Sequence, residues 1–166
     1  MTFSDIASEH LRYHRWATER VIGKCLDIPA ELLVKDLKGS FPTIYDYLAH
    51  LYQADKIWLD RLEGRPTGAR EDYAAPGCTW ELRDAWLIVQ DKMIVWANTV
   101  EESAWPEART YGTFSSGSFQ SALWQMVLHV VNHGTHHRGQ ITNMLRQVDV
   151  KPENIDLIAF YRISTS

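Results

Sequence analysis

Between residues 119 and 148, apolar side chains recur at intervals of three and four, which is the spacing of one face of an α-helix. The segment contains no proline, and the preceding sequence SSGS offers Ser118 as an N-cap. We therefore predict a long amphipathic helix over residues 119–148. Its expected buried stripe consists of Phe119, Leu123, Met126, Val130, Ile141, Met144 and Val148.

Three further segments carry helical patterns. They span residues 4–27, residues 43–63 and a stretch that begins at residue 79. Thr2 and Asp5 stand in a capping-box spacing at the start of the first segment, and Gly64 is a suitable residue to end the second. The apolar contacts expected from the third are Trp80, Leu82, Trp86, Val89, Met93, Val95 and Trp96. Four amphipathic helices of this length favour a bundle.

The connections between these segments are long. Residues 28–41 could contain a short turn of helix, and residues 65–78, rich in glycine, proline and charge, indicate a loop. Residues 104–118 suggest an irregular or hairpin-like excursion around Gly112, and a short terminal helix is expected from Asn154 or Asp156. The predicted fold is therefore all-α: one domain over residues 1–166, a four-helix bundle with long connections and a short C-terminal helix.

Charge and composition argue against two classes of partner. The formal net charge is −4 and no run of lysine or arginine occurs, so we expect no nucleic-acid partner. No apolar run of about 18 residues is present, and the opening MTFSDIASEH lacks the pattern of a secretory leader. We therefore expect a soluble, cytoplasmic protein without a membrane partner. Cys25 and Cys78 lack C-x-x-C spacing, so no disulfide framework is indicated.

Four of the seven histidines fall within nine residues, at positions 129, 133, 136 and 137. On a wheel of about 100° per residue, His137 lies about 40° from His133, inside the apolar stripe, whereas His129 and His136 lie on its polar flank. His133 and His137 are four residues apart and can converge on one metal ion. Alternatively, both are core histidines satisfied by backbone or carboxylate partners. Gly134 stands where an H-E-x-x-H motif has its glutamate, so a built-in general base is missing.

Two imidazoles alone make a weak metal site, so a third donor must come from another helix. His50, His14 and His10 are the candidates. His50 lies at the edge of the apolar stripe of its predicted helix, whereas His10 and His14 share the apolar face of theirs. Distance in sequence does not choose among the three.

Three segments resemble the DinB/YfiT superfamily of DinB-like metalloenzymes. They are GSFPTIYDYLAHLYQADKIWLDRLEG, LWQMVLHVVNHGTHHRGQITNMLRQ and IDLIAFYR. The most specific piece is NHGTHHRGQ together with a histidine in the second helix, and the resemblance spans nearly the whole chain. It implies a four-helix bundle in which His50, His133 and His137 bind one divalent metal ion, with zinc, nickel, iron and manganese all open. The remaining coordination positions would be left to water or substrate.

The first helix resembles the family's pattern of tyrosine, asparagine and tryptophan, here Tyr13, His14 and Trp16. His14 replaces the usual asparagine, so it could be a fourth ligand, a group that supports a ligand, or an acid or base in the pocket. His10 shares this ambiguity. We expect His129 to support a ligand or line the pocket, which makes His14 and His129 the candidates for a catalytic pocket.

Four other residues carry weaker expectations. His136 is expected to be solvated or to contact a helix. Arg138 and Gln140 belong to the matching motif and are expected to make packing and polar contacts between helices. Asp55 could orient a ligand or pair with an arginine, and the sequence does not decide between these roles.

The resemblance and the histidines together favour a metal-dependent enzyme acting on a small molecule. Characterised relatives include transferases and isomerases that use low-molecular-weight thiols, so the most concrete expectation is a thiol-dependent S-transferase. A nucleophile elbow and a glycine-rich phosphate loop are both absent. The alternatives are a non-catalytic metal-binding bundle that acts in stress response or as a dimeric interaction module, and a bundle whose histidines only fill a core. Exposed aromatics and the pairing of relatives favour a homodimer.

Overall fold

The computed structural model describes residues 1–77, 79–114 and 117–164. In chain order its elements are α1 (Phe3–Leu26), α2 (Ala30–Leu33), α3 (Ile44–Leu62), a 3₁₀ turn (Arg70–Tyr73), α4 (Thr79–Ala97), a 3₁₀ turn (Glu102–Ala104), β1 (Ala108–Gly112), β2 (Ser118–Ala122), α5 (Leu123–Gln147) and α6 (Leu157–Ser164). The chain is therefore mostly helical, as predicted, with one small antiparallel sheet of β1 and β2.

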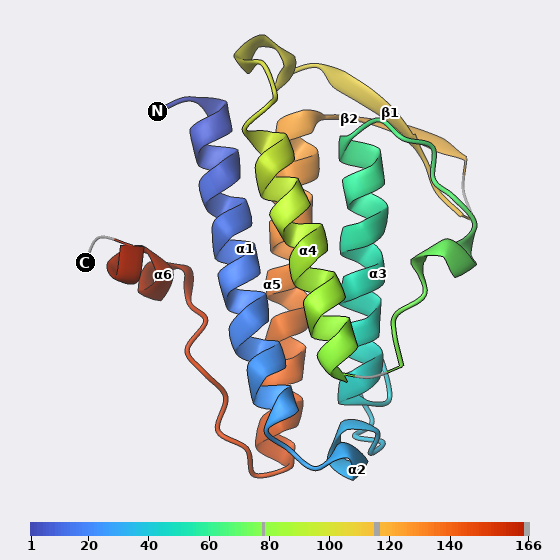
Figure 1. Cartoon of the computed structure of the whole chain (residues 1–166), viewed down its shortest axis with the longest axis vertical. Coiled ribbons are helices and arrows are strands. Elements are labelled where there is room, and N and C mark those ends of the chain that lie inside the picture. Colours follow the sequence, from blue (N-terminus) through green and yellow to red (C-terminus); the bar gives the residue numbers. More distant parts are fainter. Residues whose placement is uncertain (78, 115–116, 165–166) are drawn as a thin grey trace.

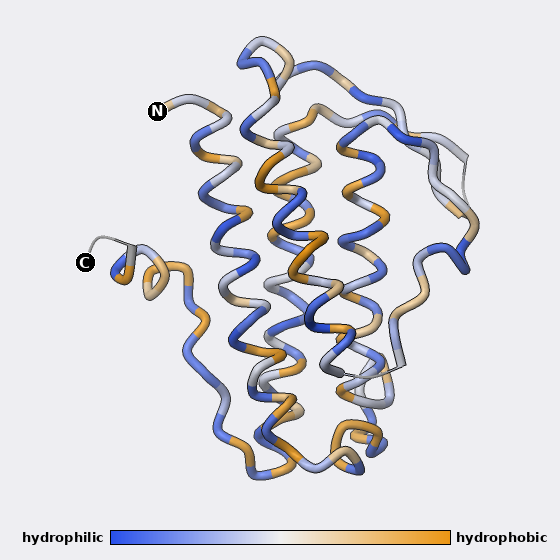
Figure 2. The backbone as a smooth tube through the Cα atoms, viewed as in Figure 1, coloured by the Kyte–Doolittle hydropathy of each residue, from blue (hydrophilic) through white to orange (hydrophobic). Residues whose placement is uncertain are grey.

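Within the described residues, four helices of 19 to 25 residues lie side by side: α1, α3, α4 and α5 (Figure 1). Both α1 and α3 pack against α4 and α5. Hydrophobic and hydrophilic residues alternate along these helices at the interval of a helical turn (Figure 2), so apolar stripes can meet in one core. Leu11, Leu51, Met93 and Ile141 come from the four different helices, and each is at most 1% exposed.

The boundaries of α1 and α3 follow the sequence signals closely. The Thr2 hydroxyl accepts a hydrogen bond from the Asp5 backbone N–H at 3.1 Å, and the Asp5 carboxylate accepts one from the Thr2 N–H at 2.8 Å. Gly64 follows α3 with a φ of 74°, a left-handed conformation that favours glycine. Both predicted helices are confirmed to within one residue at each end.

The predicted start of the helix over residues 119–148 is wrong. Ser118 does not cap a helix and Phe119 does not begin one, because both lie in β2, which pairs with β1. The excursion predicted around Gly112 is thus a true hairpin that extends to Ala122. The helix begins at Leu123. The side chain of Gln125, in its first turn, accepts a hydrogen bond from the Ala122 N–H at 2.9 Å. Phe119 is 48% exposed instead of belonging to the buried stripe.

The predicted start of α4 at Thr79 is confirmed, but two of its expected apolar contacts are wrong. Trp80 and Val95 are 56% and 64% exposed, because α4 packs on α1 and α3 along one side only. Cys25 is buried in α1, while Cys78 lies outside the described residues.

The segments that connect the long helices are also broadly as predicted. The linker after α1 contains the short helix α2, and the predicted loop after α3 contains a 3₁₀ turn. The terminal helix α6 begins at Leu157, directly after Asp156. Among the described residues, every helix is too short or too polar to cross a lipid bilayer.

Candidate metal centre

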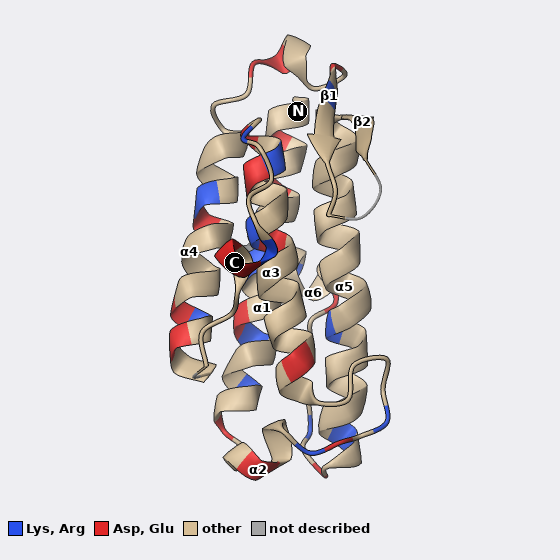
Figure 3. Cartoon of the chain, turned by 90° about the vertical axis from the view of Figure 1, so that its right-hand side faces the viewer, with Lys and Arg blue, Asp and Glu red and all other residues tan. Residues whose placement is uncertain are grey.

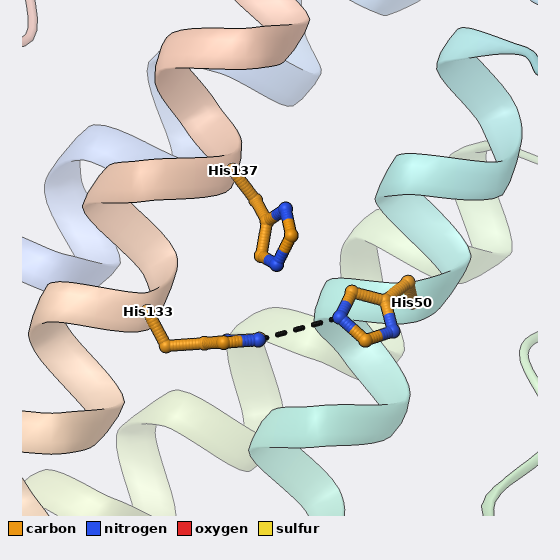
Figure 4. A group of neighbouring side chains, drawn as sticks. All are labelled: His50, His133 and His137. Atoms are coloured by element: carbon orange, nitrogen blue, oxygen red, sulfur yellow. Dashed lines mark hydrogen bonds between the residues drawn. The ribbon is translucent and has the colours of Figure 1, made fainter. Parts of the chain in front are cut away.

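Three histidines from two helices converge at the seam between α3 and α5. His50 projects from α3, His133 and His137 project from α5, and the three rings point toward one another (Figure 4). One ring nitrogen of each residue lies within 4.8 Å of the other two. The ring centroids are 5.2 Å apart for His50 and His133, 4.8 Å for His50 and His137, and 4.5 Å for His133 and His137. All three side chains are partly exposed.

The spacing of the nitrogens fits a metal ion. Nε2 of His50 lies 3.3 Å from Nε2 of His133. Two imidazole nitrogens bound at about 2.0 to 2.1 Å in tetrahedral geometry are about 3.3 Å apart, so these rings stand at the spacing of metal ligands. Neutral imidazole is a good ligand for zinc, nickel and iron. The three residues could therefore hold a divalent metal ion.

Burial and mutual repulsion keep the rings neutral. Burial, with the neighbouring His137, His50 and His129, lowers the pKa of His133 from 6.5 to about 4. Burial and the nearby His137 lower the pKa of His50, and burial lowers the pKa of His137. A histidine must be neutral to bind a metal, so binding at neutral pH requires no proton to leave these rings.

Neighbouring side chains hold two of the rings in place. Nδ1 of His137 lies 2.6 Å from Oε1 of Gln140. An amide oxygen only accepts, so Nδ1 carries the proton and Nε2 keeps its lone pair. The Phe41 ring packs on the His50 ring with centroids 4.6 Å apart, and Tyr47 packs on His137 at 5.8 Å. The sequence motif had singled out Gln140 without indicating this role.

The other two histidines of the α5 cluster lie beside the group rather than in it. The His129 ring stacks on the His133 ring with centroids 5.7 Å apart and contacts Trp58 on α3 at 4.6 Å. His129 also lines a groove of about 690 Å³ that residues of α1, α5 and α6 form. His136 is exposed, and its ring meets the His137 ring at 4.9 Å.

A network of buried polar groups lies on the core side of this seam. Nε2 of His14, a residue with 0% exposure, lies 2.9 Å from Oδ2 of Asp55. Nη1 of Arg138 lies 2.9 Å from Nδ1 of His14. Because a guanidinium can only donate, Nδ1 accepts and Nε2 donates to the carboxylate. Trp86 and Gln90 donate to the same Asp55 oxygen at 2.6 and 2.9 Å.

This network joins opposite charges across the core. Although burial acts to raise it, the pKa of Asp55 is lowered below its ordinary value by His14 and by the hydrogen bonds from Trp86 and Gln90. Asp55 is therefore a carboxylate, and Arg138 is its counter-charge on the other side of the His14 ring. Both ring nitrogens of His14 are occupied by these contacts, which leaves neither free for the metal group.

Gly134 makes the network possible. A Cβ atom at this position would stand 2.3 Å from Cε1 and 2.6 Å from Nδ1 of His14, well inside contact distance. Only a glycine lets α5 approach the His14 ring this closely. Gly134 directly follows His133, and Arg138 directly follows His137. The two histidines therefore face α3, whereas Gly134 and Arg138 face His14 on α1.

The buried face of α5 is wider than the predicted stripe. It comprises Leu123, Met126, Val127, Val130, Val131, Gly134, Arg138, Ile141, Thr142, Met144 and Leu145. Because α5 packs on both α1 and α3, its buried sector extends past the stripe, and His133 and His137 lie at the edge instead of inside it.

Sequence reasoning missed most of the buried network. Gln90 was not considered, and Trp86 was expected only to make apolar contacts. Polar residues in the apolar faces of three helices were the available signal, because a buried polar side chain requires a partner. His10 is separate from both groups: its Nδ1 donates to the Ile6 carbonyl at 2.9 Å.

Comparisons with known proteins point to one family. The model of the DinB family matches residues 2–164. Protein DinB from Bacillus subtilis (strain 168) is 29% identical over 152 residues, which cover 87% of each chain. The crystal structure of a DinB-like protein from Bacillus cereus ATCC 10987 superposes with a TM-score of 0.67 at 17% identity, covering 86% of this chain and 91% of the other.

Proposed function

Because the chain belongs to the DinB family, we propose that it is a metal-dependent enzyme on a four-helix bundle, with His50, His133 and His137 holding one divalent metal ion. Its substrate is a small molecule, and the most concrete reaction is transfer of a low-molecular-weight thiol to an electrophile. The proposal depends on one observation: ring nitrogens of three partly exposed histidines lie within 4.8 Å of one another.

The donor set supports a reactive site over a closed structural one. Structural zinc sites complete their tetrahedron with four protein ligands, whereas three histidines leave a position for water or substrate. A divalent metal ion held by His50, His133 and His137 would lower the pKa of a coordinated thiol or water, so that a nucleophile would be available near neutral pH.

The surrounding residues of the chain have defined tasks in this proposal. Gln140 holds the proton on Nδ1 of His137 and keeps the other nitrogen available. His129 stacks on His133 beside the group, and in this proposal its ring would accept the proton that an incoming thiol releases. Phe41 and Tyr47 pack on the rings of His50 and His137 and hold them in place.

The test is metal-dependent conjugation. Protein purified without a nickel column would be stripped with a chelator, reloaded with zinc, nickel, iron(II) or manganese, and assayed with glutathione, bacillithiol or mycothiol and an aromatic electrophile. We expect turnover with at least one metal and a loss on the order of 100-fold in His137→Ala, since a lost ligand weakens metal binding. His136→Ala is the matched control, because His136 is the exposed neighbour.

Three outcomes separate the alternatives. Turnover that survives in His137→Ala would contradict the metal centre. Metal bound by elemental analysis, without turnover across the substrate panel, would favour the non-catalytic metal-binding bundle. A protein that takes up no metal would leave the histidines as packing residues.

A further inference from the structure

Two arginines are buried among the described residues, and only one of them has a counter-charge. Arg138 is balanced by Asp55 through the ring of His14. Arg61, on the last turn of α3, is 8% exposed, and no described carboxylate lies within ion-pair distance of it. Its sequence neighbour Asp60 binds Arg65 and the Tyr73 hydroxyl instead.

The two strands and the helix α5 that lie near Arg61 supply no acid, and Glu63, two residues further along the chain, pairs with Arg65. Neither α5 nor the strands β1 and β2 carry an Asp or Glu, and α5 has only two charged residues, both arginines (Figure 3). Nη2 of Arg61 donates to the Gly112 carbonyl at 3.0 Å, and Nε is buried without a hydrogen-bond partner. The guanidinium carbon lies 4.6 Å from the Trp58 ring centre and 5.1 Å from that of Tyr111.

This arrangement leaves a cation short of stabilisation. Removing a guanidinium from water is costly unless it is paired and its donors are satisfied. Contacts with two aromatic faces offset part of that cost. The Gly112 carbonyl and the rings of Trp58 and Tyr111 do not bind the Arg61 guanidinium through the pair of parallel N–H groups that a carboxylate would use.

Arg61 is connected to the candidate metal centre by a row of rings. His133 stacks on His129, His129 contacts Trp58 with centroids 4.6 Å apart, and the guanidinium lies over Trp58. Arg61 follows His50 by eleven residues, which is about 16 Å along α3. A ligand that extends from the metal centre along the α3–α5 seam would reach the end of this row.

We propose that Arg61 is the anion-binding subsite of the metal centre, and that the substrate is an elongated molecule with a carboxylate at the end remote from its metal-binding group. This inference rests on the proposed function. A carboxylate fits better than a doubly charged phosphate because Arg61 is a single cation that lies against two uncharged aromatic rings. The Trp58 ring provides the apolar wall along which the middle of the substrate lies.

The test uses cobalt-loaded protein, whose thiolate-to-cobalt absorption band reports binding without turnover. The probes are mercaptopropionate, mercaptohexanoate and mercaptoundecanoate, each compared with the mercapto-alcohol of the same length. The variants are Arg61→Gln and Arg61→Lys. Arg65→Gln is the matched control, since Arg65 lies nearby, is half exposed and is already paired with Asp60 and Glu63.

In the wild type we expect the carboxylate to bind about tenfold more tightly than the alcohol at the length that spans the seam, and not at the shortest length. The preference should fall to about threefold in Arg61→Lys, which keeps the charge without the fork, and vanish in Arg61→Gln. Arg65→Gln should keep the full preference.

Two results would overturn the inference, and they differ in what they imply. Cobalt and thiol binding without any carboxylate preference, or a preference that survives in Arg61→Gln, would make Arg61 a structural residue that only anchors the hairpin through Gly112. Failure to bind cobalt would overturn the metal centre together with its subsite. If Arg61→Gln does not fold, the wild type is compared with Arg61→Lys alone. An equal preference for the carboxylate over the alcohol in these two proteins would contradict a carboxylate bound by the Arg61 guanidinium.

Discussion

At the scale of single residues, the ring of His14 on α1 occupies the space that a Cβ atom at position 134 of α5 would need. Gly134→Ala should therefore destabilise the protein by about 1 to 3 kcal/mol, the usual cost of an added methyl group in a packed core. Urea unfolding of the metal-free protein measures the change. Gly139→Ala is the control in the same helix: its Cβ would meet nothing within 4 Å, so the variant should be as stable as the wild type or gain up to about 1 kcal/mol. Equal effects at both positions would contradict the contact.

Protonation of His133 should destabilise the metal-free protein in acid. Its pKa is lowered by burial and by neighbouring histidines to about 4 from 6.5, so the folded chain binds this proton less readily than the unfolded chain. Stability present above pH 6.5 is therefore lost as the pH falls toward about 4, and the melting temperature should drop across that window. His133→Asn, which cannot take up a proton, should show a shallower decline. If the melting temperature of His133→Asn fell with pH as steeply as that of the wild type, the lowered pKa of His133 would be contradicted.

At the scale of elements, the buried carboxylate of Asp55 joins α1, α3 and α4. Asp55→Asn removes the counter-charge of Arg138 and should cost about 3 to 5 kcal/mol, because it leaves a buried charge unpaired. Chemical denaturation gives the value. Asp91→Asn breaks an exposed ion pair between α4 and Arg15 on α1 and should cost less than about 1 kcal/mol. Similar losses in the two variants would show that the buried network contributes no more than a surface pair.

The same elements show what sequence can predict. The capping spacing at Thr2 and the glycine at position 64 mark the boundaries of α1 and α3 because such signals depend on local backbone hydrogen bonds. The start of α5 depends on the pairing of β2 with β1, in which Phe119 pairs with Tyr111, and no local signal distinguishes Phe119 in β2 from Phe119 in a first helical turn. Likewise, a wheel gives the angles between His133 and His137 but not the width of the buried sector, which the two neighbours of α5 set.

At the scale of the whole molecule, metal binding should stabilise the fold, because the three histidines belong to helices that are distant in sequence and would be held together. At a free metal concentration about 100 times Kd, the gain is about 2.7 kcal/mol, or a rise of about 5 to 10 °C in Tm for a chain of this size. Differential scanning fluorimetry with zinc measures it. His50→Ala should lose the rise and His136→Ala should keep it. A rise that persists in His50→Ala would place the metal elsewhere.

The site itself was only partly readable at this scale. Residue spacing indicated the pair His133 and His137, but His50 came from a family resemblance, since which histidine of which helix faces the pair depends on how the helices pack. The position of His14 could not be read either. Its face of α1 was evident from the wheel, whereas its partners Asp55 and Arg138 come from two other helices.

The missing side chain at position 134 has a consequence for variation among homologues. The ring of His14 fills the volume that a Cβ at 134 would need, so the two positions should covary although they lie in the first and last long helices. A homologue with alanine or serine at 134 is expected to carry a residue shorter than histidine at 14. A chimera that combined the α5 of such a homologue with the α1 of this chain would clash at that single point, and shortening position 14 alone should restore it.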